Sequence, residues 1–266
     1  MRTNRLLQTG LILSVLLVLA PSTVFPYSVL WDTSHGVAGG NYQPSGYYQT
    51  LVQHLGDNGF TVDTTTGGFL SVNLADYDVI VVCLASAYDS AYTTAEVACI
   101  ADFVDDGGGL LIMGDRQDRP GKDNEYIQPV ANEFNITLGV SNLSPLELYA
   151  SDFTGHPIFG GIDEIYMYAA GELTASGPAS AAAWKEGTGE AIAAVAEYGQ
   201  GRVVALGDCS LWAKNEFWDY FNKEDNPQFS LNTFNYLAVP EPATIALLGI
   251  GGLILLKNRR TSRPER

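Results

Sequence analysis

Six polar side chains stand where open α/β sheets commonly hold their ligands. Most of them directly follow a short apolar run, and one precedes the last helical segment of the chain. In such sheets ligands bind at the carboxyl ends of the strands. If these side chains converge, they form a carboxylate-rich crevice able to hold Ca²⁺ or a network of sugar hydroxyls. The candidate crevice consists of Asp32, His35, Asp115, His156, Asp208 and Asn226.

A simpler interpretation applies to the same carboxylates. Asp32, Asp115 and Asp208 each follow a predicted strand, where an Asp side chain commonly caps a turn or the next helix. His156 stands in GHPIFGGI, a turn sequence in which a packed, hydrogen-bonded His is the more common outcome. We therefore favour capping for the three carboxylates and packing for His156.

A Ser/His/Asp hydrolase is also considered at the first strand. Asp32, Ser34 and His35 lie close together in the sequence. Neighbouring residues of a strand point to opposite faces, so Asp32 and Ser34 share a face that His35 does not. The pattern therefore disfavours a catalytic triad.

Metal-binding patterns are weak. The acidic segment Asp115, Asp118, Asp123 and Glu125 lacks the spacing of a Ca²⁺ loop. The three cysteines, Cys83, Cys99 and Cys209, form no CxxC or Cys/His pattern. Cys83 and Cys209 fall in apolar runs and are expected to be small core residues. No cofactor is expected, with Ca²⁺ as the one open possibility.

The elements that must position these residues are read from apolar periodicity. Strands are predicted at 28–35, 60–66, 77–85 and 109–115, and helices at 45–59 and 93–109. Continuous apolar strands that alternate with amphipathic helices indicate a doubly wound, mainly parallel sheet with helices on both faces. The second half is richer in β-structure, with strands expected at 137–150, 165–176, 190–199 and 201–210 and a final helix at 229–238.

Several segments resemble a known fold in their order along the chain. They are LADYDVIVVCLAS, TTAEVACIADFVDDGGGLLIMGD, FTGHPIFGGI, YGQGRVVALGDCSLW and NPQFSLNTFNYLA. They are similar to the class I glutamine amidotransferase-like (flavodoxin-like) fold, and closest to its ThuA-like and DUF4350-like extracellular branches. The resemblance implies a catalytic Cys on the turn after the strand GLLIMGD. This chain offers Met113, Gly114 and Asp115 there, and its three histidines include no His/Glu pair near the carboxyl end. Amidotransferase activity is therefore not expected.

The charge distribution separates the ends of the chain from its middle. Seven of the 14 Lys and Arg residues and two of the 30 Asp and Glu residues lie in the two terminal segments. The middle thus holds 28 acidic and 7 basic residues, a net charge near −21. Such a surface repels nucleic acid and other anionic polymers.

Residues 1–22 have the pattern of a secretory signal peptide. Arg2 and Arg5 precede an apolar stretch at 10–20, which is short for a membrane span. Small residues before Ser22 predict cleavage by signal peptidase near that position. The segment 23–238 is then the exported body.

Residues 239–266 read as a second hydrophobic address. Pro240, Glu241 and Pro242 precede fourteen uncharged residues, which span roughly 21 Å as a helix, and then a basic cluster. Basic residues after an apolar segment keep that end in the cytoplasm. The membrane-anchor positions are Ala243, Leu247, Leu248, Ile250, Leu253 and Leu256, and the basic stop is Lys257, Arg259 and Arg260.

This order of features resembles the PEP-CTERM sorting signal of Gram-negative bacteria. The resemblance implies that an exosortase cuts near the Pro-Glu-Pro triplet. It also implies a protein of the bacterial cell envelope, exported across the inner membrane, transiently anchored, and then held at the cell surface or released. The family is associated with bacteria that produce exopolysaccharide.

Two functions from different classes follow. The first is a non-enzymatic surface module that contacts exopolysaccharide or another envelope protein. The alternative is a carbohydrate-active or ThuA-like enzyme in which Asp32, His35, Asp115 and Asp208 surround a metal. The segment LWAKNEFWDYF (211–221) bears on the first, because its aromatic residues, if exposed, can stack on sugar rings.

Overall fold

The computed structural model describes residues 26–37, 41–83, 91–116 and 124–238. The predicted signal peptide, the predicted sorting tail, Asp118 and Asp123 lie outside these ranges. None of the helices in the described ranges has the length and hydropathy of a membrane-spanning segment.

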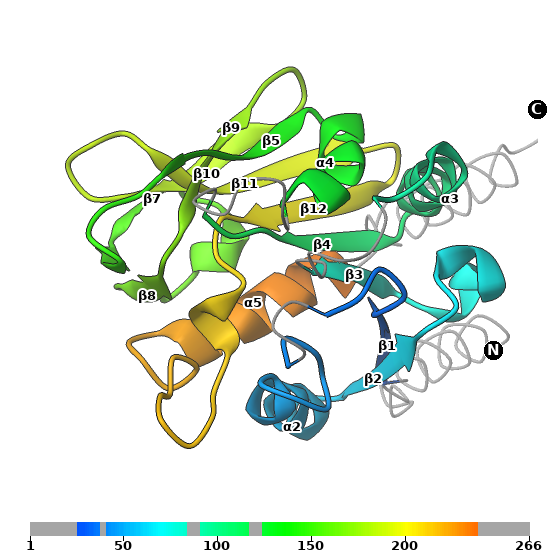
Figure 1. The fold of residues 1–266 in the computed structure, drawn as a ribbon, viewed down its shortest axis with the longest axis horizontal. Coiled ribbons are helices and arrows are strands. Elements are labelled where there is room, and N and C mark those ends of the chain that lie inside the picture. Colours follow the sequence, from blue (N-terminus) through cyan, green and yellow to red (C-terminus); the bar gives the residue numbers. More distant parts are fainter. Residues whose placement is uncertain (1–25, 38–40, 84–90, 117–123, 239–266) are drawn as a thin grey trace, which may run out of the picture.

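One eight-stranded sheet forms the centre of the body, in the order β2-β1-β3-β4-β12-β11-β10-β7 (Figure 1). Its first five strands are parallel, as predicted. β3 and β4 are buried along their whole length, which explains why their sequences are continuously apolar. The parallel strands are β1 (Tyr27–Asp32), β2 (Phe60–Thr65), β3 (Val79–Cys83), β4 (Gly109–Met113) and β12 (Gly201–Leu206).

The other half of the sheet is antiparallel, so the sheet is more mixed than the sequence predicted. β11 and β12 form a hairpin around Gly199 and Gln200, as the sequence indicated, with Tyr198 paired to Gly201. β10 was not expected, because Ser-Ala-Ala-Ala-Trp has no β-branched residue. The antiparallel strands are β7 (Asp152–Phe153), β10 (Ser180–Trp184) and β11 (Ala191–Tyr198).

Two expected strands are each divided in two. Segment 137–150 forms two strands in different small sheets, and so does segment 165–176. The first small sheet pairs β5 with β9 and the second pairs β6 with β8. These strands are β5 (Ile136–Asn142), β6 (Glu147–Ala150), β8 (Ile165–Tyr168) and β9 (Gly171–Ala175).

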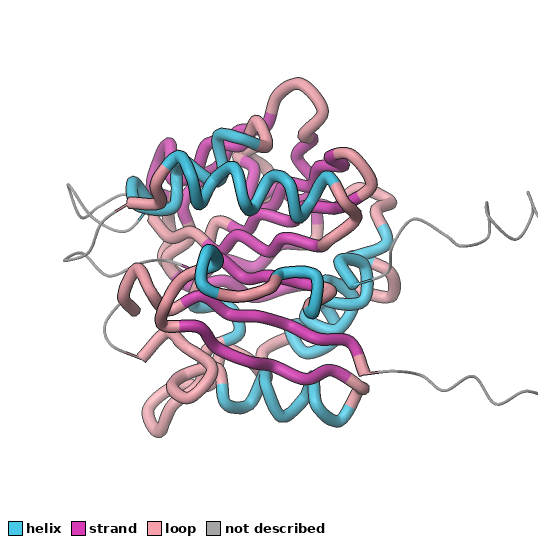
Figure 2. The backbone as a smooth tube through the Cα atoms, turned by 90° about the vertical axis from the view of Figure 1, so that its right-hand side faces the viewer, coloured by secondary structure: helices cyan, strands magenta, loops and turns pink. Residues whose placement is uncertain are grey.

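Helices cover both faces of the large sheet, as predicted, and each face has its own core. α2 and α5 pack on one face, and α3 and α4 on the other. Figure 2 shows the strands stacked between helical segments. The sequence did not predict α4, which contains Pro129 and only a narrow apolar stripe. The helices are α2 (Gln49–Asp57), α3 (Thr94–Asp105), α4 (Asn124–Glu133) and α5 (Asn226–Ala238), with short 3₁₀ turns η2 (Phe69–Ser71), η3 (Leu74–Asp76), η4 (Pro157–Phe159) and η5 (Ser210–Trp212).

The first and last described elements meet at the amino edge of the parallel strands. Ser28, in β1, donates its backbone N–H to the Asp78 carboxylate at 2.7 Å. Asp78 in turn lines a cavity together with Gly108 and with Ala238, the last residue of α5. The candidate crevice, by contrast, was predicted at the opposite, carboxyl edge.

Candidate binding site at the carboxyl edge of the sheet

Asp32 ends β1 and is the centre of a buried hydrogen-bonded group. Its Oδ1 accepts the Ser34 backbone N–H at 2.9 Å. Its Oδ2 accepts the Tyr92 hydroxyl at 2.6 Å and lies 3.0 Å from His35 Nδ1. Burial acts to raise the pKa of Asp32, but the hydrogen bonds from His35, Tyr92 and Ser34 outweigh it, so the pKa lies below its usual value. The Asp32 carboxylate therefore stabilises the turn that follows β1.

His35 is held between two carboxylates. Its Nε2 lies 3.4 Å from Glu96 Oε1, and its ring stacks on Tyr92 with 3.8 Å between the ring centroids. Burial lowers the pKa of His35, but Asp32 and Glu96 together raise it above the usual value. Glu96 is fixed by the capping box with Thr93 that begins α3. The His35 group thus ties the end of β1 to the start of α3.

The expectation that Ser34 and His35 point to opposite faces is wrong. β1 ends at Asp32, so strand alternation does not extend to the turn residues that follow. Ser34 Oγ lies 3.0 Å from His35 Nδ1, the same nitrogen that faces Asp32. A catalytic triad needs the nucleophile and the carboxylate on different ring nitrogens. The arrangement is therefore a hydrogen-bonded turn and does not have triad geometry.

Asp208 and Asp115 form a second group, at the ends of β12 and β4. Asp208 is fully buried; its Oδ2 accepts the Tyr168 backbone N–H at 2.7 Å and its Oδ1 accepts that of Ser210 at 2.6 Å. Burial, with Asp115 nearby, raises the pKa of Asp208 to about 8. Asp115 Oδ1 accepts the Arg116 backbone N–H at 2.8 Å. Both carboxylates cap turns, and Asp208 also joins β8 to the end of β12.

Two buried thiols line the same edge. Cys83 and Cys209 are buried in one hydrophobic cluster, as the sequence predicted. Tyr48 lies between them: its hydroxyl is 3.4 Å from Cys83 Sγ and donates to the Cys209 carbonyl at 2.7 Å. Burial, followed by the charge of nearby Asp115, raises the pKa of the Cys209 thiol. Such a thiol is a poor nucleophile, because the thiolate is the reactive form.

The remaining two candidates do not face this edge as ligands. Asn226 is fully buried and donates to the carbonyls of Tyr166, Leu211 and Tyr220, each at 2.9 Å, so it joins α5 to β8 and the loop after β12. His156 begins η4, where its Nδ1 accepts a backbone N–H, and its ring packs edge-on against Tyr236.

The six candidates thus separate into different places. Asp32 and His35 form one group, Asp115 and Asp208 another, and the other two serve local packing. Within the described ranges, no group of three or more His, Cys, Asp or Glu side chains is placed to hold a metal ion. Of the second acidic segment, Glu125 lies in the first turn of α4.

Beside Asp208, aromatic rings form a continuous row that we call the aromatic strip. The rings come from three segments far apart in the sequence: Tyr47 before α2, Trp218 and Tyr220 in the loop after β12, and residues of β6 and β8. Consecutive ring centroids lie 4.7–5.5 Å apart. The sequence pointed to the loop but not to its partners. The aromatic strip is Tyr47, Trp218, Tyr220, Tyr168, Tyr166 and Tyr149.

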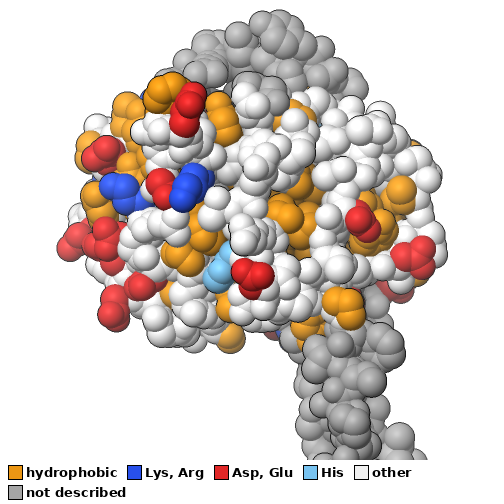
Figure 3. Space-filling model, turned by 90° about the horizontal axis from the view of Figure 1, so that it is seen from below, with side chains coloured by type: hydrophobic (Ala, Val, Ile, Leu, Met, Phe, Trp, Pro, Cys, Tyr) orange, Lys and Arg blue, Asp and Glu red, His pale blue; other side chains and the backbone are white. Residues whose placement is uncertain are grey.

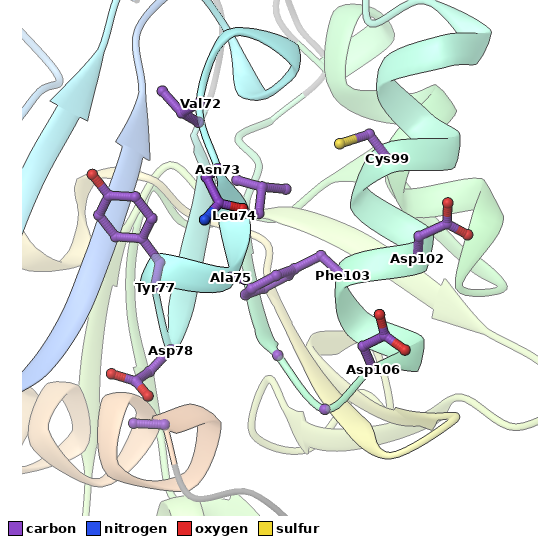
Figure 4. Close-up of a pocket in the computed structure, with 13 residues that line it drawn as sticks. Val72, Asn73, Leu74, Ala75, Tyr77, Asp78, Cys99, Asp102, Phe103 and Asp106 are labelled. Carbon is purple, nitrogen blue, oxygen red and sulfur yellow. The ribbon is translucent and has the colours of Figure 1, made fainter.

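A cavity of about 560 Å³ opens at the other edge of the sheet. Figure 4 shows it between the η3 segment and one side of α3, with Phe103 reaching across and Asp102 and Asp106 along the helix. Asp78 lies at its base, where its carboxylate is engaged by Ser28. The cavity is therefore separate from the predicted crevice, on the edge where the described chain begins and ends.

A family comparison identifies the carboxyl end of the chain. Residues 238–260 match the PEP-CTERM protein-sorting motif. The chain therefore carries this motif, which implies an exported protein that is sorted by an exosortase. No curated protein matches the chain by sequence.

Structural comparison places the body among glutamine amidotransferase-like and ThuA-like domains at low identity. The N-terminal domain of mmIFT52 is similar with a TM-score of 0.64 and 16% identity, over 81% of this chain and 99% of that one. A putative ThuA-like protein from Bacteroides uniformis gives 0.51 and 14%, over 82% and 93%. A putative GMP synthase protein from Thermoplasma acidophilum gives 0.51 and 11%, over 80% and 94%. These likenesses show the fold alone.

Proposed function

We propose that the chain is an exported bacterial surface protein whose body, residues 23–238, is a non-enzymatic binding module. Signal peptidase removes residues 1–22, and an exosortase then cuts the precursor near the Pro-Glu-Pro triplet. The apolar segment of the tail holds the precursor in the inner membrane until that cut. The mature body is then displayed at the cell surface or in the extracellular matrix.

The observation that carries this proposal is the sorting motif at 238–260. It begins at Ala238, the last residue of α5, so the folded body ends where the address begins. Cleavage near the triplet therefore leaves every described helix and strand intact. A cut inside α5 would instead remove Phe234 and Leu237, both of which are buried in the core.

The placement of the two edges supports display of a binding surface. β1 begins and α5 ends at the amino edge, near Asp78. The polar groups around Asp32 and Asp208 and the aromatic strip lie at or beside the carboxyl edge. A body held by its carboxyl terminus thus directs its amino edge toward the membrane and the opposite edge outward.

The chemistry-bearing residues support a non-enzymatic role. Asp32, His35 and Asp208 are each engaged in hydrogen bonds that fix turns. The alternative, a metal-assisted enzyme, requires its carboxylates and His to meet at one point, and the described residues offer no such group. Binding needs only a fixed surface, which these turns supply.

Mass spectrometry of envelope and medium fractions from the host tests the proposal. We expect a mature chain that lacks its first two dozen or so residues and ends between Val239 and Pro242. A variant with Pro240, Glu241 and Pro242 all changed to Ala should keep its carboxyl terminus and remain with the inner membrane. Arg263→Ala, outside the matched motif, is the control and should be processed normally. Recovery of surface protein with an intact Arg266 would contradict the proposal.

A further inference from the structure

We propose that the aromatic strip binds a polysaccharide chain whose pyranose rings carry no negative charge. This proposal rests on the surface display proposed above and names the ligand class of the displayed module. Sugar rings present flat C–H faces that pack on aromatic rings, and their hydroxyls require hydrogen-bonding groups around them. The strip and its surroundings supply both.

The rings of the strip are held in a fixed arrangement before any ligand binds. Tyr220 lies between Trp218 and Tyr168, stacked at 12° to the first and 16° to the second. Tyr47 meets Trp218 edge to face, with 4.9 Å between centroids. Asn226 fixes the Tyr220 carbonyl from below. A pre-organised surface binds with a smaller loss of side-chain entropy.

Exposed rings stand at both ends of the strip. Phe217, beside Trp218, is 84% exposed, and Tyr149, which meets Tyr166 edge to face, is 39% exposed. Leu146, close to Tyr149 in the sequence, is 42% exposed. Figure 3 views the molecule from below and shows hydrophobic side chains exposed among carboxylates, with the basic side chains gathered on one side. Exposed aromatic surface of this kind marks binding sites on soluble proteins.

Polar groups border the rings. Burial, together with the neighbouring Tyr168, Asp208 and Glu147, raises the pKa of Tyr220. Its hydroxyl is therefore neutral over the physiological range and is a donor as well as an acceptor. Glu147 is an exposed carboxylate of β6, close enough to influence both Tyr220 and Tyr166. Sugar hydroxyls can donate to this carboxylate and exchange hydrogen bonds with the phenols.

Charge decides which polysaccharide fits. The two lysines at the strip are already engaged: Lys214 pairs with Asp219 at 2.7 Å, and the Lys223 ammonium lies 5.0 Å from the Tyr166 ring centroid. Glu147 and Glu216 add negative charge nearby, and the whole chain carries a net charge of −16. Uronate-containing or sulfated chains are repelled by such a field, whereas uncharged chains and amino-sugar chains are not.

The test measures binding of three soluble hexasaccharides by isothermal titration calorimetry on the mature protein. The probes are cellohexaose (uncharged), a glucosamine hexamer (cationic) and a galacturonate hexamer (anionic). We expect binding of the uncharged or the cationic probe and none of the anionic one. Salt distinguishes the first two, because only cationic binding weakens as ionic strength rises.

A double variant, Phe217→Ser with Tyr149→Ser, should weaken that binding by roughly tenfold or more, the effect of losing about 1.4 kcal/mol of ring stacking. Both side chains are exposed, so the fold should be retained. Leu70→Ser removes an exposed apolar side chain from η2, away from the strip, and is the matched control.

Binding of the galacturonate probe alone, no binding of any probe by correctly folded protein, or equal affinity in the double variant would each overturn the proposal. So would a result in which the strip residues mediate only self-association, seen as a concentration-dependent mass in light scattering. None of these outcomes bears on the cleavage and sorting of the precursor, so the two proposals fail separately.

Discussion

Asp208 should make the stability of the body depend on pH in an identifiable way. Its pKa is raised from 3.8 to about 8 by burial and by Asp115. A raised folded-state pKa means that the folded protein holds the proton more tightly than the unfolded chain. The contribution to stability is therefore complete below pH 4 and is lost as the pH rises through about 8.

The size of the effect follows from the same values. One pH unit between the two pKa values corresponds to about 1.36 kcal/mol, so Asp208 alone should remove about 3 kcal/mol of stability between pH 5 and pH 7. The full span from 3.8 to about 8 sets an upper bound of about 6 kcal/mol. Other carboxylates also titrate, so a comparison with a non-titrating variant is needed.

Asp208→Asn provides that comparison. Asn keeps one acceptor oxygen, whereas Asp208 accepts from two backbone N–H groups, those of Tyr168 and Ser210. The variant should therefore be less stable at pH 5, by about 1–3 kcal/mol for the unsatisfied donor. Because it has no charge to bury, the gap should close by about 3 kcal/mol at pH 7 and reverse at higher pH.

The assay is urea unfolding followed by Trp fluorescence at pH values from 4 to 9, with the free energy of unfolding compared at each pH. Asp115→Asn is a second variant: it removes a nearby carboxylate, so the loss of stability should end at a lower pH. If the difference between the parent protein and Asp208→Asn is constant over this range, Asp208 does not titrate with a raised pKa.

Two further predictions concern local packing. A Cβ at Gly109 would lie 2.5 Å from the Leu237 carbonyl oxygen, so Gly109→Ala should destabilise the body by about 1–3 kcal/mol in urea unfolding, whereas Gly155→Ala, which meets nothing within 4 Å, should change little; equal effects would contradict the close packing of α5 on β4. Thr93→Ala removes the capping box of α3 and should cost about 1 kcal/mol, and hydrogen exchange should rise first at the start of that helix; uniform exchange along α3 would argue against the cap.

The parallel half of the fold could be predicted from the sequence, and the antiparallel half only in part. Segments such as VIVVC and GLLIM are buried on both faces, so each residue carries the same apolar signal. β10 consists mainly of alanines, which favour neither helix nor strand strongly in this context. α4 was missed because Pro129 and its polar neighbours obscure the apolar stripe of Ile127 and Val130.

The candidate site was predictable residue by residue but not as an arrangement. The sequence indicated that Asp32 and Asp208 end strands, and the structure places them so. It did not indicate that Ser34 and His35 share a side with Asp32, because the alternation rule was carried past the end of β1. The aromatic strip depends on contacts between Tyr168 and Tyr220, which are brought together by the fold and leave no local pattern.

The separation of the two edges links the sorting signal to the site. α5 contributes to both: its first residue, Asn226, holds the Tyr220 loop under the strip, and its last, Ala238, adjoins the matched motif. A helix of this length places the strip and the exit of the tail on opposite sides of the body. A ligand bound at the strip therefore does not cover the segment that the exosortase must reach. Processing and binding can thus proceed on one molecule without competing for the same surface.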